Sequence, residues 1–303
     1  MITENALNII AALKVKNIGK SWIIKNISNN LSDEAIATKL KITLDDFYRY
    51  KEDAQNELES LRGYIDGCVA FCDSVFPKHK NIKDTDKPIL LTYKGDLKLL
   101  DENLLKIAVI GLLNPCDKIR VLEEQILDKM LEKDAVIISG LANGCDEIAH
   151  KYTLKKGGAT VAILPSTLKN ILPKSNTALA QDIVAQGGLL MSEYYADITH
   201  YYELTKRYIE RDRLQALFSS AVCLIASYNE NDRKNDRNKD AGSRHAMQKA
   251  QEWGITRLAP RGLERDERFN LNRDVLKNGA KEINKDNINS VLDGLKSNHS
   301  LHI

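Results

Sequence analysis

The chain has 303 residues, of which 43% are apolar and 28% carry a charge. This length gives one large domain or two smaller ones with a hydrophobic core, and the composition excludes a disordered or fibrous protein. The formal net charge of +2 excludes a surface that is basic throughout, so any nucleic-acid site must be a local basic patch. No apolar run reaches the roughly 18 residues that a membrane-spanning helix needs.

The N-terminus and the cysteines predict where the chain works. The first residues, MITENALNII, lack the basic n-region of a signal peptide. Five cysteines, an odd number without a CxxC pair, indicate reduced thiols. Cys68 and Cys72 are about one helical turn apart, and no His or third Cys completes a zinc set, so ordinary packing is favoured over a redox or metal role. We therefore expect a cytoplasmic protein with no membrane attachment, metal or cofactor.

Residues 1–75 are helical in pattern and predict a small helical N-terminal domain. Apolar residues recur at helical spacing from Ala6 to Leu13, Ser32 suits the N-cap of a further helix, and residues 52–64 form another. Residues 15–20 faintly resemble the turn of a helix-hairpin-helix motif, with Asn17 where that motif usually has its first glycine. Lysines beside such a turn could touch a DNA phosphate, but a solvated turn is the simpler interpretation.

Residues 76–104 are interpreted as a connector with a short strand at 89–93, and the pattern changes at about residue 105. From there, the predicted strands are 107–110, 135–138, 160–164, 189–191, 221–225 and 255–258, and the predicted helices are 115–132, 143–156, 176–186, 202–218 and 241–253. This alternation predicts an α/β fold over residues 105–285, a Rossmann-like parallel sheet with helices on both faces. Ligands of such sheets bind beyond the strand C-termini. Residues 228–240 are expected to be a mobile polar loop, and residues 286–303 a C-terminal helix and tail.

The stretch 139–150, SGLANGCDEIAH, lies where a predicted strand turns into a helix. Gly140 and Gly144 there let the backbone approach a ligand closely, and the free N–H groups of a helix start favour an anion such as phosphate. Gly111, at the end of the preceding strand, is weaker evidence of the same kind. Asp146 and His150 are four residues apart on one helix face, so they could act as acid and base or form a structural pair that orders the loop.

This stretch resembles the SGLAxGxDxxAH signature of the DNA-processing protein A family, DprA or Smf. Three further segments resemble those of the family in the same order: 157–176 with GGxTxAVL…YPxxN, 188–194 with GxLLSEY, and 208–213 with FxxRNR. Leu172, Met191, Tyr208 and Asp212 replace the family's Tyr, Leu, Phe and Asn in them. The resemblance spans residues 76 to 285. It implies a protein that binds single-stranded DNA during bacterial transformation and hands it to a RecA-type recombinase.

Two of the family's cations are missing from this chain. Leu112 and Leu113 follow Gly111 where the family usually carries Ser-Arg, and Asn143 stands for the arginine of its SGLARG signature. Each lost phosphate contact weakens the electrostatic contribution to DNA binding. The loop at 228–240 is also longer than usual for the family.

A basic cluster consists of Lys206, Arg207, Arg211 and Arg213, with Tyr208 beside it. Arginines clamp phosphates and an aromatic ring can stack a base, so the cluster predicts a DNA contact. The alternative is a solvated helix, because neighbouring acids offset much of the charge. The resemblance then implies a DNA-binding set. Its members are Gly111, Ser139, Gly140, Asn143, Gly144, Asn176, Lys206, Arg207, Tyr208, Arg211, Arg213 and Ser243.

The leading hypothesis is a non-enzymatic, homodimeric protein that protects single-stranded DNA and loads a RecA-type recombinase. The alternative is a nucleotide-binding sensor, which the missing arginines and the polar loop favour. A nucleotide phosphoribohydrolase is a third possibility, but the chain lacks the PGGxGTxxE string of that family. Glu193 could be a general base for such an enzyme, or a carboxylate that orders a loop.

Overall fold

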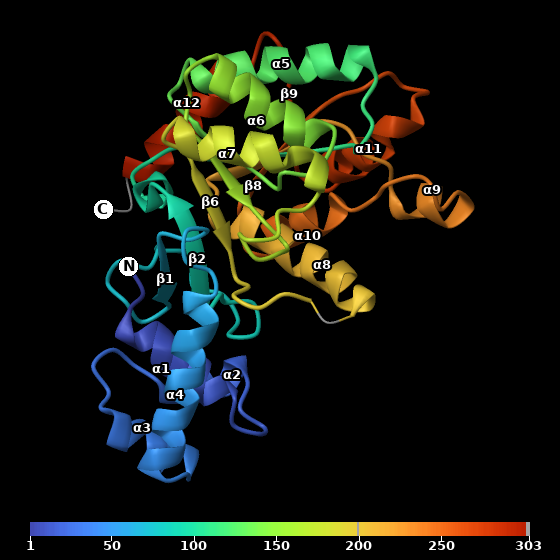
Figure 1. The fold of residues 1–303 in the computed structure, drawn as a ribbon. Coiled ribbons are helices and arrows are strands. Elements are labelled where there is room, and N and C mark those ends of the chain that lie inside the picture. Colours follow the sequence, from blue (N-terminus) through green and yellow to red (C-terminus); the bar gives the residue numbers. More distant parts are fainter. Residues whose placement is uncertain (199, 301–303) are drawn as a thin grey trace.

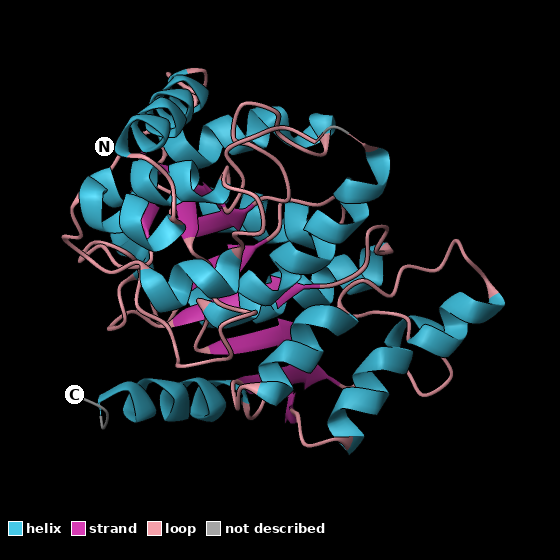
Figure 2. Ribbon diagram, turned by 90° about the horizontal axis from the view of Figure 1, so that it is seen from below, coloured by secondary structure: helices cyan, strands magenta, loops and turns pink. Residues whose placement is uncertain are grey.

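A computed structural model describes residues 1–198 and 200–300, except the side chains of 201 and 296–300. It shows one nine-stranded sheet with the strand order β1-β2-β6-β5-β4-β3-β7-β8-β9 (Figures 1 and 2). The strands are β1 Gly67–Ala70, β2 Leu90–Gly95, β3 Lys106–Ile110, β4 Val136–Ser139, β5 Thr160–Ile163, β6 Leu189–Ser192, β7 Ala221–Leu224, β8 Thr256–Pro260 and β9 Lys281–Ile283. From β6 to β9 all neighbours are parallel, whereas β2 is antiparallel to both β1 and β6. The predicted α/β fold is therefore confirmed.

Helices cover both faces of this sheet, as Figure 2 shows. The first face carries α5 Asp117–Leu131, α6 Cys145–Lys155, α7 Thr177–Ala185 and α12 Ile288–Ser300, and the second α8 Tyr201–Leu217, α10 Arg244–Glu252 and α11 Asn270–Lys277. The two cores follow from the two-residue period of the strands. On β3, Ala108 and Ile110 pack into the core beneath α8 and α10, while Ile107 and Val109 pack into the core beneath α5.

The N-terminal helices form a separate lobe against the antiparallel edge of the sheet (Figure 1). They are α1 Glu4–Leu13, α2 Lys20–Asn26, α3 Asp33–Leu40 and α4 Leu44–Glu59. Their apolar core includes Phe47 and Leu58 and continues onto Cys68 and Ala70 of β1. In the turn between α1 and α2, Asn17 adopts a left-handed φ of 66°, the conformation that a glycine usually supplies.

Several element predictions are wrong in detail. Residues 67–70 form a strand, so Cys68 and Cys72 do not share a helix, and the predicted helix at 52–64 begins at Leu44 and ends at Glu59. The expected mobile loop contains α9 Glu230–Asn235, because Asn229 and Asp232 form a capping box at its start. Two further elements, α11 and β9, were not predicted from the sequence. Its division into domains at residues 75, 104 and 285 stays a prediction.

Two absences hold for the described part of the chain. None of its helices combines the length and apolar character needed to cross a membrane. Its His, Cys, Asp and Glu side chains form no group of three or more that is arranged to hold a metal ion.

Candidate nucleic-acid interface

A cavity of about 320 Å³ lies at the carboxyl edge of the parallel strands. The strand order reverses at β3, which has β4 on one side and β7 on the other, and such a switch point is the usual ligand site of an open α/β sheet. Gly111 follows β3 and lines the cavity, together with Asn143 after β4, Tyr208 and Arg211 from α8, and Ser243 before α10. The structure therefore has a cavity at the predicted location of the site, and five of the twelve predicted residues line it.

Position 140 needs a glycine because side chains of the protein itself lie against its backbone. A Cβ atom at this position would lie 1.3 Å from Nη1 of Arg211 and 2.5 Å from Nε2 of Gln215. The guanidinium of Arg211 therefore lies directly against the backbone of the turn, where it also donates to the carbonyl of Ile163 (3.3 Å). The expectation that Gly140 leaves room for phosphate is wrong, because Arg211 fills that room.

The anion at this turn is the carboxylate of Asp146. Its Oδ2 accepts hydrogen bonds from the backbone N–H groups of Gly140 (3.1 Å) and Ala142 (3.3 Å) and lies 3.7 Å from Nη1 of Arg211. At Gly144, with φ +79°, a Cβ atom would lie 2.3 Å from the carbonyl oxygen of Leu112. Asp146 thus occupies the amides of Gly140 and Ala142, and the predicted phosphate contact with the amide of Gly140 is wrong. A contact with the amide of Gly144 stays a prediction.

Asp146 and His150 bind different partners and do not form an acid–base pair. His150 is fully buried, and its Nδ1 shares a hydrogen bond with Oγ1 of Thr160 (2.8 Å). Burial, with the positive charge of Arg211 adding to it, lowers the pKa of His150 to about 3, so its imidazole is neutral at physiological pH. Of the two predicted roles, Asp146 has the structural one, since it orders the loop.

The remaining arginines of the basic cluster are buried and paired, so the solvent-facing clamp that their spacing predicted is absent. Arg207 is 6% exposed, binds Glu203 (2.7 Å), and lies 4.1 Å from the ring centre of Tyr194. Arg213 is 6% exposed and makes two hydrogen bonds to Glu193 (2.6 and 2.7 Å). Glu193 is thus held in an ion pair, which argues against a free general base.

Other predicted residues hold the loops of this edge together. Ser139 is buried and donates to the carbonyl of Val109 (2.7 Å), while Asn176 donates to the carbonyls of Leu141 and Ala142. Ser243 donates to the carbonyl of Gly111 (3.1 Å), which ties the start of α10 to the end of β3. Their part in DNA binding stays a prediction.

The floor of the cavity has more acid than base. Asp146, Asp212 and Asp240 line it with Arg211. Burial raises the pKa of Asp212 to about 7, and the Asp146 and Asp240 carboxylates add to this effect against the opposing charge of Arg211. Burial also raises the pKa of Asp146. A floor of this charge disfavours a phosphate group inside the cavity.

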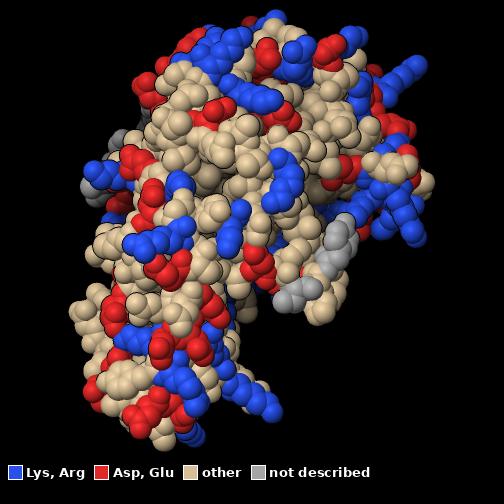
Figure 3. Space-filling model, in the orientation of Figure 1, with Lys and Arg blue, Asp and Glu red and all other residues tan. Residues whose placement is uncertain are grey.

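Further cations, which were not among the predicted site residues, surround this edge. Those without an ion pair in the described part of the chain are Lys118, Lys174, Arg233, Arg237 and Arg244. Lys174 follows Pro173 of the cavity wall. Burial lowers the pKa of His245, and the charges of Arg244 and Arg233 lower it further, which places both arginines near this side chain. Figure 3 shows Lys and Arg gathered over α9, whereas both signs are interspersed over the N-terminal helices. The sequence signal for Lys118 and Arg244 was their place at the start of two predicted helices that follow strands of the sheet.

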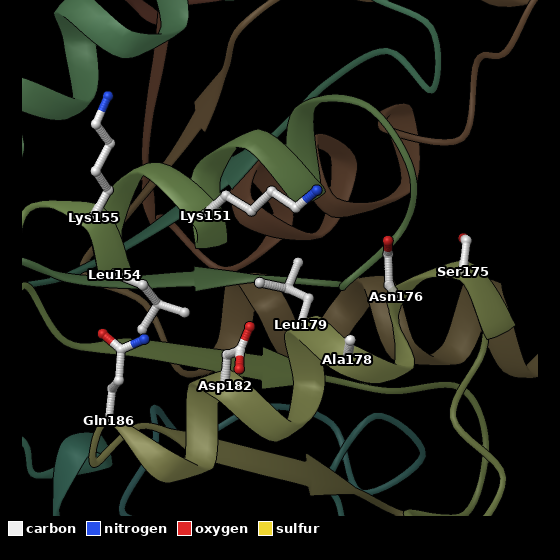
Figure 4. Close-up of a pocket in the computed structure, with 9 residues that line it drawn as sticks. All are labelled: Lys151, Leu154, Lys155, Ser175, Asn176, Ala178, Leu179, Asp182 and Gln186. Carbon is white, nitrogen blue, oxygen red and sulfur yellow. The ribbon is translucent and has the colours of Figure 1, made fainter.

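A second hollow of about 440 Å³ lies between α6 and α7 (Figure 4). Lys151, Lys155 and Asp182 line it, and Asn176 borders it near the carboxyl edge. Lys151 is paired with Glu147 at 2.5 Å. This hollow lies on a helical face of the sheet and is not part of the site at the strand ends.

A family comparison decides how the chain is classified. Residues 67–293 match the model of the DNA recombination-mediator protein A family. This range includes every strand of the sheet. The chain belongs to this family. Its resemblance to DprA and Smf proteins, predicted from residue 76 onwards, is confirmed and begins at the first residue of β1.

Two relatives agree with this classification, and a solved structure has the same fold. The chain is 40% identical over 109 residues to DNA processing protein DprA of Streptococcus pneumoniae, and 29% identical over 153 residues to Protein Smf of Escherichia coli. These matches cover 36% and 50% of the chain, but only 37% and 40% of the relatives. The crystal structure of the S. pneumoniae protein matches 93% of this chain and 95% of its own at 24% identity, with a TM-score of 0.71.

A second solved structure describes the single-stranded DNA binding mode of DNA processing protein A from Helicobacter pylori. It covers 76% of this chain and 94% of its own at 25% identity, with a TM-score of 0.58.

Proposed function

We propose that the chain binds single-stranded DNA across the carboxyl edge of its sheet, without catalysis, and serves DNA processing in transformation or recombination. The observation that carries the proposal is the family match over residues 67–293, which contains the switch-point cavity and the cations around it. A DNA-binding relative of the same fold supports it. Protection of the strand, delivery to a RecA-type recombinase and a homodimeric state follow from the resemblance and belong to the same proposal.

Backbone contacts come from exposed cations in this proposal. Lys174 and Lys206 flank the cavity on two different elements, and their side chains reach solvent. Lys206 lies 3.6 Å from Glu210, a loose pair that a phosphate can displace. Bases that turn inward meet Tyr208 at the cavity wall, where stacking tolerates any sequence.

The test is fluorescence anisotropy with a labelled single strand over a range of salt concentrations. Each phosphate contact to a single strand contributes roughly 0.7 to the slope of log affinity against log salt. Changing both Lys174→Gln and Lys206→Gln should therefore reduce the slope by about 1.4. The matched control is Lys98→Gln with Lys277→Gln. Both lysines are exposed at the amino edge of the parallel strands, and neither forms an ion pair with the residues that the structure describes.

Two outcomes would contradict the proposal. Equal slopes for the two double variants would remove the carboxyl edge as the DNA path. Absence of binding by the unchanged protein would favour the alternative, a nucleotide-binding sensor, which the small cavity with its single guanidinium suits. Thermal stabilisation by a mononucleotide without DNA binding would then select that alternative.

A further inference from the structure

The cavity of this chain differs in charge from the family pattern that the sequence resembles. Leu113 and Asn143, which replace two arginines of that pattern, both line it, and so does Asp212, which replaces an asparagine. Two lost cations and one gained carboxylate make the cavity up to three charges more negative. Because the three positions face one space, the changes alter a single binding property.

The floor offers hydrogen-bond acceptors to a ligand, and one of them has no donor in the described part of the chain. Gln215 is 2% exposed, and its Oε1 has no hydrogen-bond partner in the described part of the chain. The carboxylate of Asp212 lies beside it on α8, with one oxygen 3.1 Å from Nε of Arg211. An unpaired buried acceptor is costly, so a ligand that donates to Gln215 would gain free energy that a phosphate could not.

The walls suit a flat ring. Tyr208, Pro173 and Leu113 surround the space, and the guanidinium of Arg211 lies 5.7 Å from the ring centre of Tyr208. The volume of about 320 Å³ is near the lower end of the range for small-molecule sites, roughly 300 to 1,000 Å³. A single nucleobase that has left the stack is a ligand of this size and shape.

We infer that the cavity takes one unstacked nucleobase and prefers a base with an amino group, such as cytosine, over thymine or uracil. This inference rests on the proposed function. The amino group of cytosine donates to Asp212 and Gln215, a pairing that carboxylates make with cytosine elsewhere, and its ring nitrogen and carbonyl accept from Arg211. Uracil and thymine present a carbonyl oxygen where cytosine has its amino group, so acceptor would meet acceptor.

The experiment compares oligo-dC with oligo-dU of equal length by fluorescence anisotropy at pH 8. The two strands differ in the donor and acceptor pattern of the base and share backbone and ring size. The unchanged protein should bind oligo-dC at least about fivefold more tightly, the lower limit for a good contact to a base edge. Asp212→Asn should lose most of this preference and keep, or strengthen, its binding of oligo-dU.

Two further variants separate base preference from charge and folding. Asp236→Asn removes the same charge from an exposed position on the same edge outside the cavity, and should keep the preference. Leu113→Arg, at a side chain that is 42% exposed, should strengthen binding of both strands about equally and make it steeper in salt. Melting temperatures confirm that each variant is folded.

The outcomes distinguish the inference from the function on which it rests. Equal binding of oligo-dC and oligo-dU by the unchanged protein would overturn the inference and leave DNA binding intact. A preference that survives Asp212→Asn as fully as Asp236→Asn would also overturn it. Binding of neither strand would overturn the proposed function and the inference together.

Discussion

At the scale of single residues, the side chains of the site mainly contact and pair with one another. Arg211 lies against Gly140 and between the carboxylates of Asp146 and Asp212, so a signature that resembles a phosphate loop is filled by an internal guanidinium. The position of Arg211 on its helix could not show this, because residues on one helix face recur with the same period whether that face points toward the sheet or toward solvent. Residue types alone therefore predicted the place of the site and not the direction of its side chains.

Gly140→Ala should destabilise the fold by at least about 2–3 kcal/mol, because its Cβ atom would overlap the guanidinium of Arg211. Urea denaturation measures the change. The control is Gly294→Ala in α12, where a Cβ atom has no neighbour within 4 Å and the free energy of unfolding should rise by about 0.5–1 kcal/mol. Similar stabilities for the two variants would show that Arg211 does not occupy this position.

Asp212→Asn should stabilise the protein increasingly as the pH rises. The pKa of Asp212 is raised from 3.8 to about 7, so between these values the folded state binds more protons than the unfolded state. The stability of the unchanged protein therefore falls over this window on account of Asp212, and the asparagine variant lacks this loss. Denaturation of both proteins should give equal stabilities near pH 4 and the largest gap above pH 7. A gap already complete at pH 4 would contradict the assignment.

At the scale of elements, α8 connects the loops around the site. Its arginines reach loops that follow different strands: Arg211 contacts the turn after β4, and Arg213 binds Glu193 after β6 and the carbonyl of Asp86 before β2. The sequence predicted this helix within one residue at each end. Its neighbour α9 was taken for a loop, because a short helix with a capping box and no buried residue has no apolar period to detect.

Arg213→Ala should lower the free energy of unfolding by about 3 kcal/mol, because it leaves the carboxylate of Glu193 buried without its main partner. Lys206→Ala on the exposed side of the same helix should change it by less than about 0.5 kcal/mol. Thermal or urea denaturation separates the two. If a variant of Arg211 or Arg213 lost DNA binding, the loss could therefore result from unfolding as well as from a missing contact to DNA. Equal stabilities for the two variants would contradict the role of α8 in holding these loops together.

At the scale of the whole molecule, charge limits how DNA can be held. With a net charge of only +2, the proposed DNA path relies on the exposed cations around the carboxyl edge of the sheet. The five unpaired cations at this edge and the loosely paired Lys206, at roughly 0.7 per phosphate contact, allow a salt slope of at most about 4 in magnitude. Anisotropy over a range of salt concentrations measures it. A steeper slope would mean that a surface other than the carboxyl edge contacts the strand.

The sequence by itself determined the fold class and the edge of the sheet where the site lies. Alternating apolar strands and amphipathic helices leave few other ways to bury both faces of a sheet, and parallel strands bring their carboxyl ends together. Only the tertiary structure decided which arginines are internal, which acids share the cavity, and that β1 and β9 extend the sheet. These features depend on contacts between residues far apart in the chain, such as Gly140 with Arg211. No local pattern encodes such a contact, because burial and charge pairing are settled only when the elements pack.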